Sequence, residues 1–211
     1  MIFEHFSCAK GLAIMKNKLP FIALFLVVSI FLSFKSLSVF KTENQKYRLV
    51  KKEAGYEIRF YPQATFATIY SSGTSYKSVA SNGFRKLAGY IFGGNDQGKS
   101  ISMTAPVRMA FNEKGSSMSF VMPEKYTEAT LPVPKDENVH ISKSTAQYVA
   151  VITFNGYASD EKIKEQQIAL QQLLDKNKVK TTGDFTFLGY NAPYQFIGRK
   201  NEVIIPIEWK E

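Results

Sequence analysis

The sequence predicts an α+β domain made of two similar halves, each with the order strand, helix, strand, strand. Three observations lead to this prediction: long segments of the chain repeat each other, each repeat runs into a helical pattern, and the strands come in runs with one helix per half. Strands in runs favour an antiparallel sheet over a doubly wound parallel one. Two such halves can close edge to edge into a pseudo-symmetric, barrel-like sheet, which removes exposed strand edges.

The first repeated element is a strand segment that ends at a glycine. YEIRFYPQATFATIYSSG ends at Gly73 and VHISKSTAQYVAVITFNG ends at Gly156, an offset of 83 residues. Both segments are rich in β-branched and aromatic residues, which is typical of strands, and the glycine marks a turn. The same offset aligns three further pairs of identical residues: Ile58 with Ile141, Ala67 with Ala150, and Ile69 with Ile152.

A helical pattern follows each of these glycines. The first spans about 75–92 and the second about 160–176, and each has apolar residues on one side, namely Val79, Phe84, Leu87 and Ile91 in the first and Ile163, Leu170, Leu173 and Leu174 in the second. Ser159 is a suitable N-cap for the second helix. Asp160 and Glu161 then lie in its first turn, where carboxylates suit the helix dipole.

Two shorter blocks complete the repeat. At an offset of 87, Ile101 aligns with Leu188, Ala105 with Ala192 and Pro106 with Pro193, and at an offset of 83, SFVMP ending at Pro123 aligns with VIIP ending at Pro206. Four blocks in the same order make chance similarity improbable. The halves therefore cover about 52–125 and 135–209 within a domain of residues 52–211.

An apolar segment precedes the domain. Sixteen uncharged residues run from Leu19 to Phe34. The apolar span extends to 22 positions, from Leu19 to Phe40, if the Lys35 side chain can reach the membrane interface. A membrane-spanning helix needs about 17–25 such residues. We therefore divide the chain into a basic segment (1–18), a transmembrane anchor or signal segment (19–40), a linker (41–51) and the domain. A cleaved signal peptide, leaving a secreted protein, is the alternative, although Ser36-Leu37-Ser38 is a poor cleavage site.

Most of the positive charge surrounds this apolar segment. Residues 1–52 carry a net charge of +7, whereas the remaining residues carry only +2 of the total of +9. This distribution suits anionic lipid headgroups and argues against a nucleic-acid partner. The excess of Lys and Arg after the segment would keep the domain in the cytoplasm. The short basic start favours export instead, and we predict a domain exported to the periplasm or another extracytoplasmic space.

The domain lacks the residues from which catalytic and metal sites are usually built. Its only histidine is His140, and the only cysteine of the chain, Cys8, lies in the N-terminal extension. A nucleophile needs a base beside it, so we predict a non-enzymatic protein with no catalytic or metal-binding residues. Residues 92–100 (FGGNDQGKS) do not have the spacing of a phosphate-binding loop and are predicted to be a connecting turn. Abundant apolar, aromatic and methionine residues indicate a domain that holds an apolar ligand or a partner.

Several sequence blocks resemble one known family. YEIRFY (56–61), FRKLAGYIFGGN (84–95), ISMTAPV (101–107), FVMP (120–123), FNGY (154–157), GYNAP (189–193) and RKNEV (199–203) occur in this order. Together they are similar to the SOUL/heme-binding protein family, over about Lys52 to Trp209. The resemblance implies a duplicated, distorted antiparallel β-barrel flanked by two helices, and binding of heme or another tetrapyrrole without catalysis.

The resemblance also implies where the ligand binds. In relatives that ligate heme iron, a histidine follows the arginine of the YEIR block; here that position is Phe60, which cannot donate to iron. In relatives without this histidine, an apolar patch on the first helix, flanked by basic residues, holds the porphyrin. The positions that match this patch are Phe84 and Ala88, but Ser81 and Gly89 stand where basic residues are expected. Lys77 and Arg85 are nearby cations able to pair with propionates.

The sequence therefore predicts a tetrapyrrole-binding module tethered to a membrane through residues 19–40. The predicted ligand surface lies beside the first helix and includes Phe84, Ala88, Ile91, Lys77 and Arg85, with no histidine on the iron. The alternative from another class is a protein-interaction or structural module that keeps the fold but has lost heme. The sequence does not indicate which protein partners such a module would bind.

Overall fold

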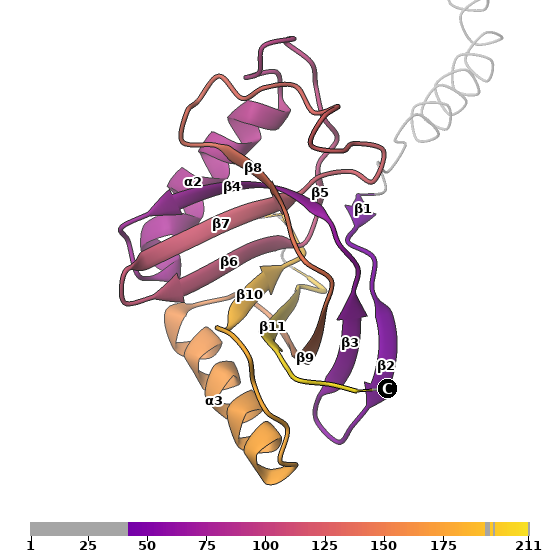
Figure 1. The fold of residues 1–211 in the computed structure, drawn as a ribbon. Coiled ribbons are helices and arrows are strands. Elements are labelled where there is room, and N and C mark those ends of the chain that lie inside the picture. The colour runs from indigo at the N-terminus through magenta and orange to yellow at the C-terminus, as the bar shows by residue number, and fades with distance from the viewer. Residues whose placement is uncertain (1–41, 193–194, 196, 211) are drawn as a thin grey trace, which may run out of the picture. The chain divides into compact units, whose positions relative to one another are not determined.

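The computed structural model describes residues 42–192, 195 and 197–210. In this part of the chain, nine strands form one antiparallel sheet (Figure 1). Their spatial order is β2 (Arg48–Lys52), β3 (Glu57–Tyr61), β9 (Gln147–Asn155), β11 (Lys200–Pro206), β10 (Thr186–Gly189), β6 (Val107–Asn112), β7 (Gly115–Val121), β4 (Thr65–Ser71) and β8 (His140–Lys143). The described part also contains two helices, α2 (Tyr76–Ile91) and α3 (Asp160–Lys176). Two short strands, β1 (Glu43–Asn44) and β5 (Thr104–Ala105), form a separate parallel pair.

The segment predicted to anchor the chain, 19–40, lies outside the described residues. Among the helices of the described part, none is long and apolar enough to cross a membrane. Residues 41–51, predicted to be a linker, contain β1 and most of β2. The antiparallel strands and two helices agree with the predicted α+β class, and the sheet is a curled half-barrel (Figure 1).

The leading strands of the two halves form one long, bent pair. Tyr61 of β3 lies opposite Gln147 of β9, and Thr65 of β4 lies opposite Lys143 of β8, which is the same register on both sides of the bend. At the bend itself, the Ser144 N–H donates to the Ala64 carbonyl over 2.9 Å. Chain segments 57–71 and 140–155 therefore pair along their length, and this pairing is what makes the sheet curl back toward itself.

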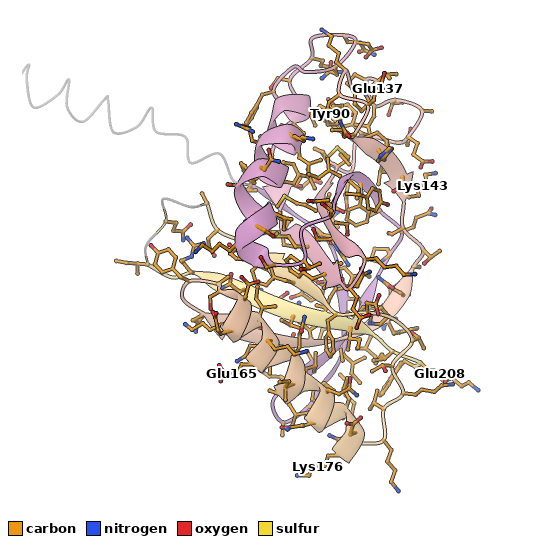
Figure 2. All side chains as sticks on the ribbon, turned by 90° about the vertical axis from the view of Figure 1, so that its left-hand side faces the viewer. Tyr90, Glu137, Lys143, Glu165, Lys176 and Glu208 are labelled. Atoms are coloured by element: carbon orange, nitrogen blue, oxygen red, sulfur yellow. The ribbon has the colours of Figure 1, made fainter. Side chains whose placement is uncertain are left out.

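Both helices pack on the same side of the sheet (Figures 1 and 2). Helix α2 contacts β4 and β7, whereas α3 contacts β9 and β11. These are corresponding strands of the two halves, so the duplication predicted from the sequence is present in the packing. The main hydrophobic core lies between the helices and this side of the sheet, and a smaller cluster on the opposite side comprises Tyr61, Val149, Val151, Leu188 and Ile204.

The pairing registers correct part of the predicted repeat. Phe66 pairs with Val121, whereas its counterpart Val149 pairs with Pro206, so the last strands correspond at an offset of 85 and not 83. The proposed match of 101–106 with 188–193 was wrong, because β10 corresponds to β6. The connection between β6 and β7 has two residues but that between β10 and β11 has ten, and this difference in length shifts the alignment.

Each helix begins at a serine cap. The Ser75 hydroxyl accepts a hydrogen bond from the Ser78 N–H, and the Ser159 hydroxyl accepts one from the Lys162 N–H. Such caps satisfy backbone donors that the first helical turn leaves free. The predicted spans of 75–92 and 160–176 and the Ser159 cap are thus confirmed.

A carboxylate ties the starts of the two helices together. Asp160, the first residue of α3, accepts from the Tyr76 N–H at 2.6 Å and from the Lys77 N–H at 3.3 Å, both at the start of α2. A carboxylate at this position also complements the α2 dipole. The sequence predicts that Asp160 complements the dipole of its own helix, α3. In the structure it also binds the start of α2.

A buried ion pair joins strands that are distant in the sequence. The guanidinium of Arg59 on β3 donates two hydrogen bonds of 3.0 Å to the carboxylate of Glu202 on β11. Arg59 is 2% exposed and Glu202 is 0% exposed. The same carboxylate accepts from the Tyr190 hydroxyl at 2.7 Å, and the Lys200 ammonium lies 2.8 Å from it. Burial opposes the charge on Glu202, but its bonds with Arg59 outweigh this and hold the pKa of Glu202 below its usual value.

Removing Glu202 should strongly destabilise the fold. Glu202→Ala leaves a buried arginine with less compensation, and breaking a buried pair typically costs about 3–5 kcal/mol of unfolding free energy. Urea unfolding measures this loss. The matched control Glu113→Ala removes an exposed carboxylate in the β6–β7 turn and should change stability by less than about 0.5 kcal/mol.

The pH dependence of the unfolding free energy also tests the role of Glu202. Since the folded pKa of Glu202 is depressed, its contribution is present above the unfolded pKa of about 4.3 and disappears as pH falls through the folded value. Wild-type stability should therefore fall more steeply than that of Glu202→Gln as pH is lowered below about 4.3. Equal acid sensitivity in the two proteins would contradict a structural role for this charge.

Candidate functional site

The outer face of α2 carries the residues that the sequence singled out. Phe84 and Ala88 are half-buried, and Phe92, the C-cap of the helix, is 68% exposed. Residues four apart lie on one face of a helix, so these three form a continuous apolar surface, which we call the α2 strip. Phe84 is its anchor, because its ring packs edge-on against Phe120 of the core with centroids 5.3 Å apart.

Phe92 is the member of the strip that the predicted site residues lacked. The spacing of positions 84, 88 and 92 is visible in the sequence and could have identified it. The glycine beside the strip adds space: a Cβ built on Gly89 would have no atom within 4 Å. The surface over the last turns of α2 is therefore both apolar and open.

Ile91 does not belong to this surface. It is 1% exposed and lies in the core between α2 and the sheet. The helical pattern of the sequence allows Ile91 to lie on the inner or the outer face of α2. In the structure it packs inward with Leu87. The prediction that Ile91 lines a ligand surface is therefore corrected.

The two predicted basic residues differ in their relation to the strip. Arg85 is exposed, and its guanidinium donates to the Asn82 side chain over 3.0 Å, one turn from Ala88. Lys77 lies 11 residues before Ala88, roughly 16 Å along the helix axis. There it acts on Glu161, whose pKa is lowered by a backbone hydrogen bond, then by Ser159, and more weakly by Lys77. Arg85 is thus the better placed cation.

A loop is fixed against the C-terminal end of α2. The Tyr90 hydroxyl donates to the Pro132 carbonyl over 2.9 Å, and burial, with a smaller effect of Asp96, raises the pKa of Tyr90 to about 12. Asp96 and Val133 exchange two further hydrogen bonds. Figure 2 shows Tyr90 at this end of α2, close to the loop that carries Glu137. The loop brings Val133, which is 63% exposed, to the end of α2 that carries Phe92.

Other features of the described residues lie away from the strip. A hollow of about 600 Å³ is lined by residues of α3 and the β6–β7 hairpin, among them Ile163 and Phe111. Within the described chain, no group of three or more His, Cys, Asp and Glu side chains is arranged to hold a metal ion. His140 is exposed on β8, with its ring 5.7 Å from that of Tyr70.

Comparison with known proteins assigns the chain to a family. The sequence profile described as SOUL heme-binding protein matches residues 42–206. The chain belongs to the SOUL heme-binding protein family. Among its relatives, heme-binding protein 2 of Mus musculus is 32% identical over 156 residues, covering 70% of this chain and 76% of that protein. Heme-binding protein 1 of Mus musculus is 29% identical over 161 residues, covering 72% and 84% respectively.

The fold also occurs in proteins of distant sequence. The crystal structure of the EcmrR C-terminal domain superposes with a TM-score of 0.56 at 11% identity, covering 72% of this chain and 96% of that one. At this identity the likeness concerns the fold alone.

Many residues of the SOUL blocks have structural roles in this protein. Arg59 of YEIRFY and Glu202 of RKNEV form the buried ion pair, and Tyr190 of GYNAP bonds to it. Asn95 of FRKLAGYIFGGN is fully buried and bonds to the Tyr90 and Lys99 backbones. These blocks therefore identify the fold more directly than they identify a ligand.

Phe60 lies far from the α2 strip in the sheet order. It is on β3, where its ring is 5.0 Å from that of Tyr148 and beneath the Arg48 guanidinium. The helix α2 contacts β4 and β7 instead. The α2 strip and Phe60, the position where the resemblance implies a histidine in some relatives, therefore belong to distant parts of the sheet order.

Two neighbouring substitutions test the division between core and surface in α2. Ile91→Ala creates a cavity in the core and should lower the unfolding free energy by about 2–5 kcal/mol. Phe92→Ala removes an exposed ring and should change it by about 0.5 kcal/mol or less. Thermal or urea unfolding monitored by circular dichroism gives both values, and comparable losses would contradict the assigned faces.

Proposed function

We propose that this SOUL protein binds heme or a related tetrapyrrole on the α2 strip, without catalysis and without a histidine axial ligand. The observation that carries the proposal is an apolar helix surface on which Phe92 is exposed and Phe84 and Ala88 are half-buried, in a chain whose relatives are named heme-binding proteins. Small-molecule sites are mostly apolar, with a few polar groups that fix orientation.

The shape of the strip supports a flat ligand. Its ends are eight residues apart, which is about 12 Å along a helix, and Gly89 leaves the space above it free. Two phenyl rings can stack on a macrocycle, while Ala88 between them allows close approach. Phe92 reaches furthest into solvent and would be covered by the ligand.

The charge around the strip supports a ligand with carboxylates. Arg85 is the exposed cation nearest to Ala88 and Gly89 and can form a bidentate bond with a propionate. Its present partner is the neutral Asn82 side chain, which a carboxylate would replace. Lys77 is less suited to pair with a propionate of the same ligand, because it lies farther away along the helix. Such a site would hold and release a tetrapyrrole more readily than it would drive redox chemistry, since no imidazole fixes the iron.

Hemin titration followed by the Soret band tests the proposal. The wild type should show saturable binding, Phe92→Asp should weaken it at least tenfold because a charge is placed beneath the macrocycle, and Phe84→Asp should abolish it. His140→Ala should leave it unchanged. Ile168→Asp, which alters a 48% exposed apolar residue of α3, is the matched control.

Failure of the wild type to bind either hemin or protoporphyrin would overturn the proposal and favour an interaction module. The band positions give further information. A spectrum with two strong nitrogen ligands on the iron would contradict a site without axial histidine. Because Phe92 is exposed, its variant should fold, so a loss of binding there cannot be attributed to unfolding.

We also propose that residues 19–40 tether the domain to a membrane and that the domain is exported. The support is the sequence: 22 positions that contain one charged residue, flanked by lysines. The full chain should sediment with membranes and need detergent for release, whereas a chain starting at residue 42 should not. Protease added to intact cells or spheroplasts should then digest the domain. Release of the full chain by high salt or alkaline carbonate would contradict the tether.

A further inference from the structure

The side of the sheet turned away from the helices carries a row of polar residues. Successive residues of a strand point to opposite sides. Met109 lies in the core under the helices, so its neighbour Arg108 points to the opposite side. Directly paired positions extend this row across six strands of the described sheet, in the order Thr153, Glu202, Leu188, Arg108, Ser119 and Thr68.

The two charged members of the row have different surroundings. Glu202 is neutralised by Arg59 and Lys200. Arg108 has no carboxylate within 4 Å among the described residues, and Leu188 lies between it and Glu202. Two strand spacings amount to roughly 10 Å, so Glu202 is too far away to pair with Arg108. One positive charge of this face therefore remains without a counter-ion.

The contacts of Arg108 are aromatic rings and one neutral amide. Its guanidinium lies 5.3 Å from the centre of the Phe66 ring and 5.9 Å from that of Tyr61. One of its N–H groups donates to the Gln45 side-chain oxygen at 3.1 Å. Burial lowers the pKa of Arg108, and the only groups that oppose this are tyrosines. Arg108 is half-buried. A guanidinium has five N–H donors, and charges withdrawn from solvent are usually paired.

A hydroxyl group near Arg108 lacks a hydrogen-bond partner among the described residues. The Tyr61 hydroxyl is fully buried and makes no hydrogen bond with the described residues. Tyr61 is 2% exposed, and burial, followed by the charge of Glu202, raises the pKa of its hydroxyl, while the nearby guanidinium groups of Arg59 and Arg108 act in the opposite direction. Tyr190, the other tyrosine of this face, already donates to Glu202. A buried polar group without a partner costs free energy and suggests an absent water, ion or ligand.

We propose that this face binds a small organic anion, whose carboxylate pairs with Arg108 and accepts from Tyr61, while its apolar part contacts Phe66. The carboxylate would replace the Gln45 amide oxygen on the guanidinium. Gln45 is half-buried, and the residues on either side of it are exposed, so this exchange can occur from solvent. This site is on the side of the sheet opposite α2 and goes beyond the proposed tetrapyrrole function.

Calorimetric titration of the full-length protein in detergent with sodium benzoate, and separately with sodium acetate, tests the inference. Ionic strength is held constant with sodium chloride, and a detergent-only titration is subtracted. Benzoate should bind saturably at one site per chain and more tightly than acetate, because its ring adds apolar contact. Arg108→Gln should weaken benzoate binding roughly tenfold or more, since a charge-assisted hydrogen bond is lost.

Tyr61→Phe should weaken benzoate binding severalfold while leaving the unfolding midpoint of the free protein unchanged or higher, because its hydroxyl has no partner to lose. Lys114→Gln, in the exposed β6–β7 turn, removes a positive charge elsewhere and should bind as the wild type does. Phe92→Asp should also retain benzoate binding, whatever its effect on hemin.

No saturable binding of either acid at tens of millimolar, or equal binding by a folded Arg108→Gln protein, would overturn the inference. Loss of benzoate binding in Phe92→Asp would do so too, because it would place both ligands on one site. Hemin binding without benzoate binding would leave the proposed function intact and reject this site alone.

Discussion

The fold of this SOUL protein depends on one buried ion pair, between Arg59 and Glu202. Arg59 is on β3 in the first half and Glu202 is on β11 in the second half, with β9 between their strands. Neither charge can be removed alone without leaving the other buried in a poorly compensated state. Tyr190 and Thr153 add hydrogen bonds to the same carboxylate, and the Tyr47 ring covers the guanidinium at 4.2 Å. The pair thus fixes how the halves register against each other.

The Arg59–Glu202 ion pair explains why family blocks that are far apart in the sequence occur in the same protein. Arg59 and Glu202 are separated by 143 residues but make two hydrogen bonds. Asn201, next to Glu202, points to the other side and donates to the Gly156 carbonyl of the FNGY block. In these pairs, one block supplies a polar group that another block satisfies, and a buried polar group needs such a partner. Part of the family pattern therefore corresponds to internal hydrogen bonds of the fold, whereas the three residues of the α2 strip all belong to one block, FRKLAGYIFGGN.

The two sides of the sheet offer different chemistry as a result. The side under the helices is an apolar core, and the outer face of α2 leaves Phe84, Ala88 and Phe92 at least partly accessible. The opposite side contains charged and hydroxyl groups, of which the Arg59 and Glu202 cluster is balanced internally and Arg108 is not. A single duplicated sheet thus separates an apolar surface from an anion-binding one.

The sequence by itself determined the element order, both helices, the Ser159 cap of the second helix and the family. These features depend on local periodicity and capping, which act within a few residues. Only the tertiary structure decided the register of the last strands, the inward position of Ile91 and the contact of Asp160 with α2. It also decided that Arg59 pairs with Glu202 while Arg108 has no carboxylate within 4 Å in the described part of the chain. Those outcomes depend on which strands become neighbours and how loops of unequal length connect them, and the hydrophobic pattern of a single segment contains no information about its neighbours across the sheet.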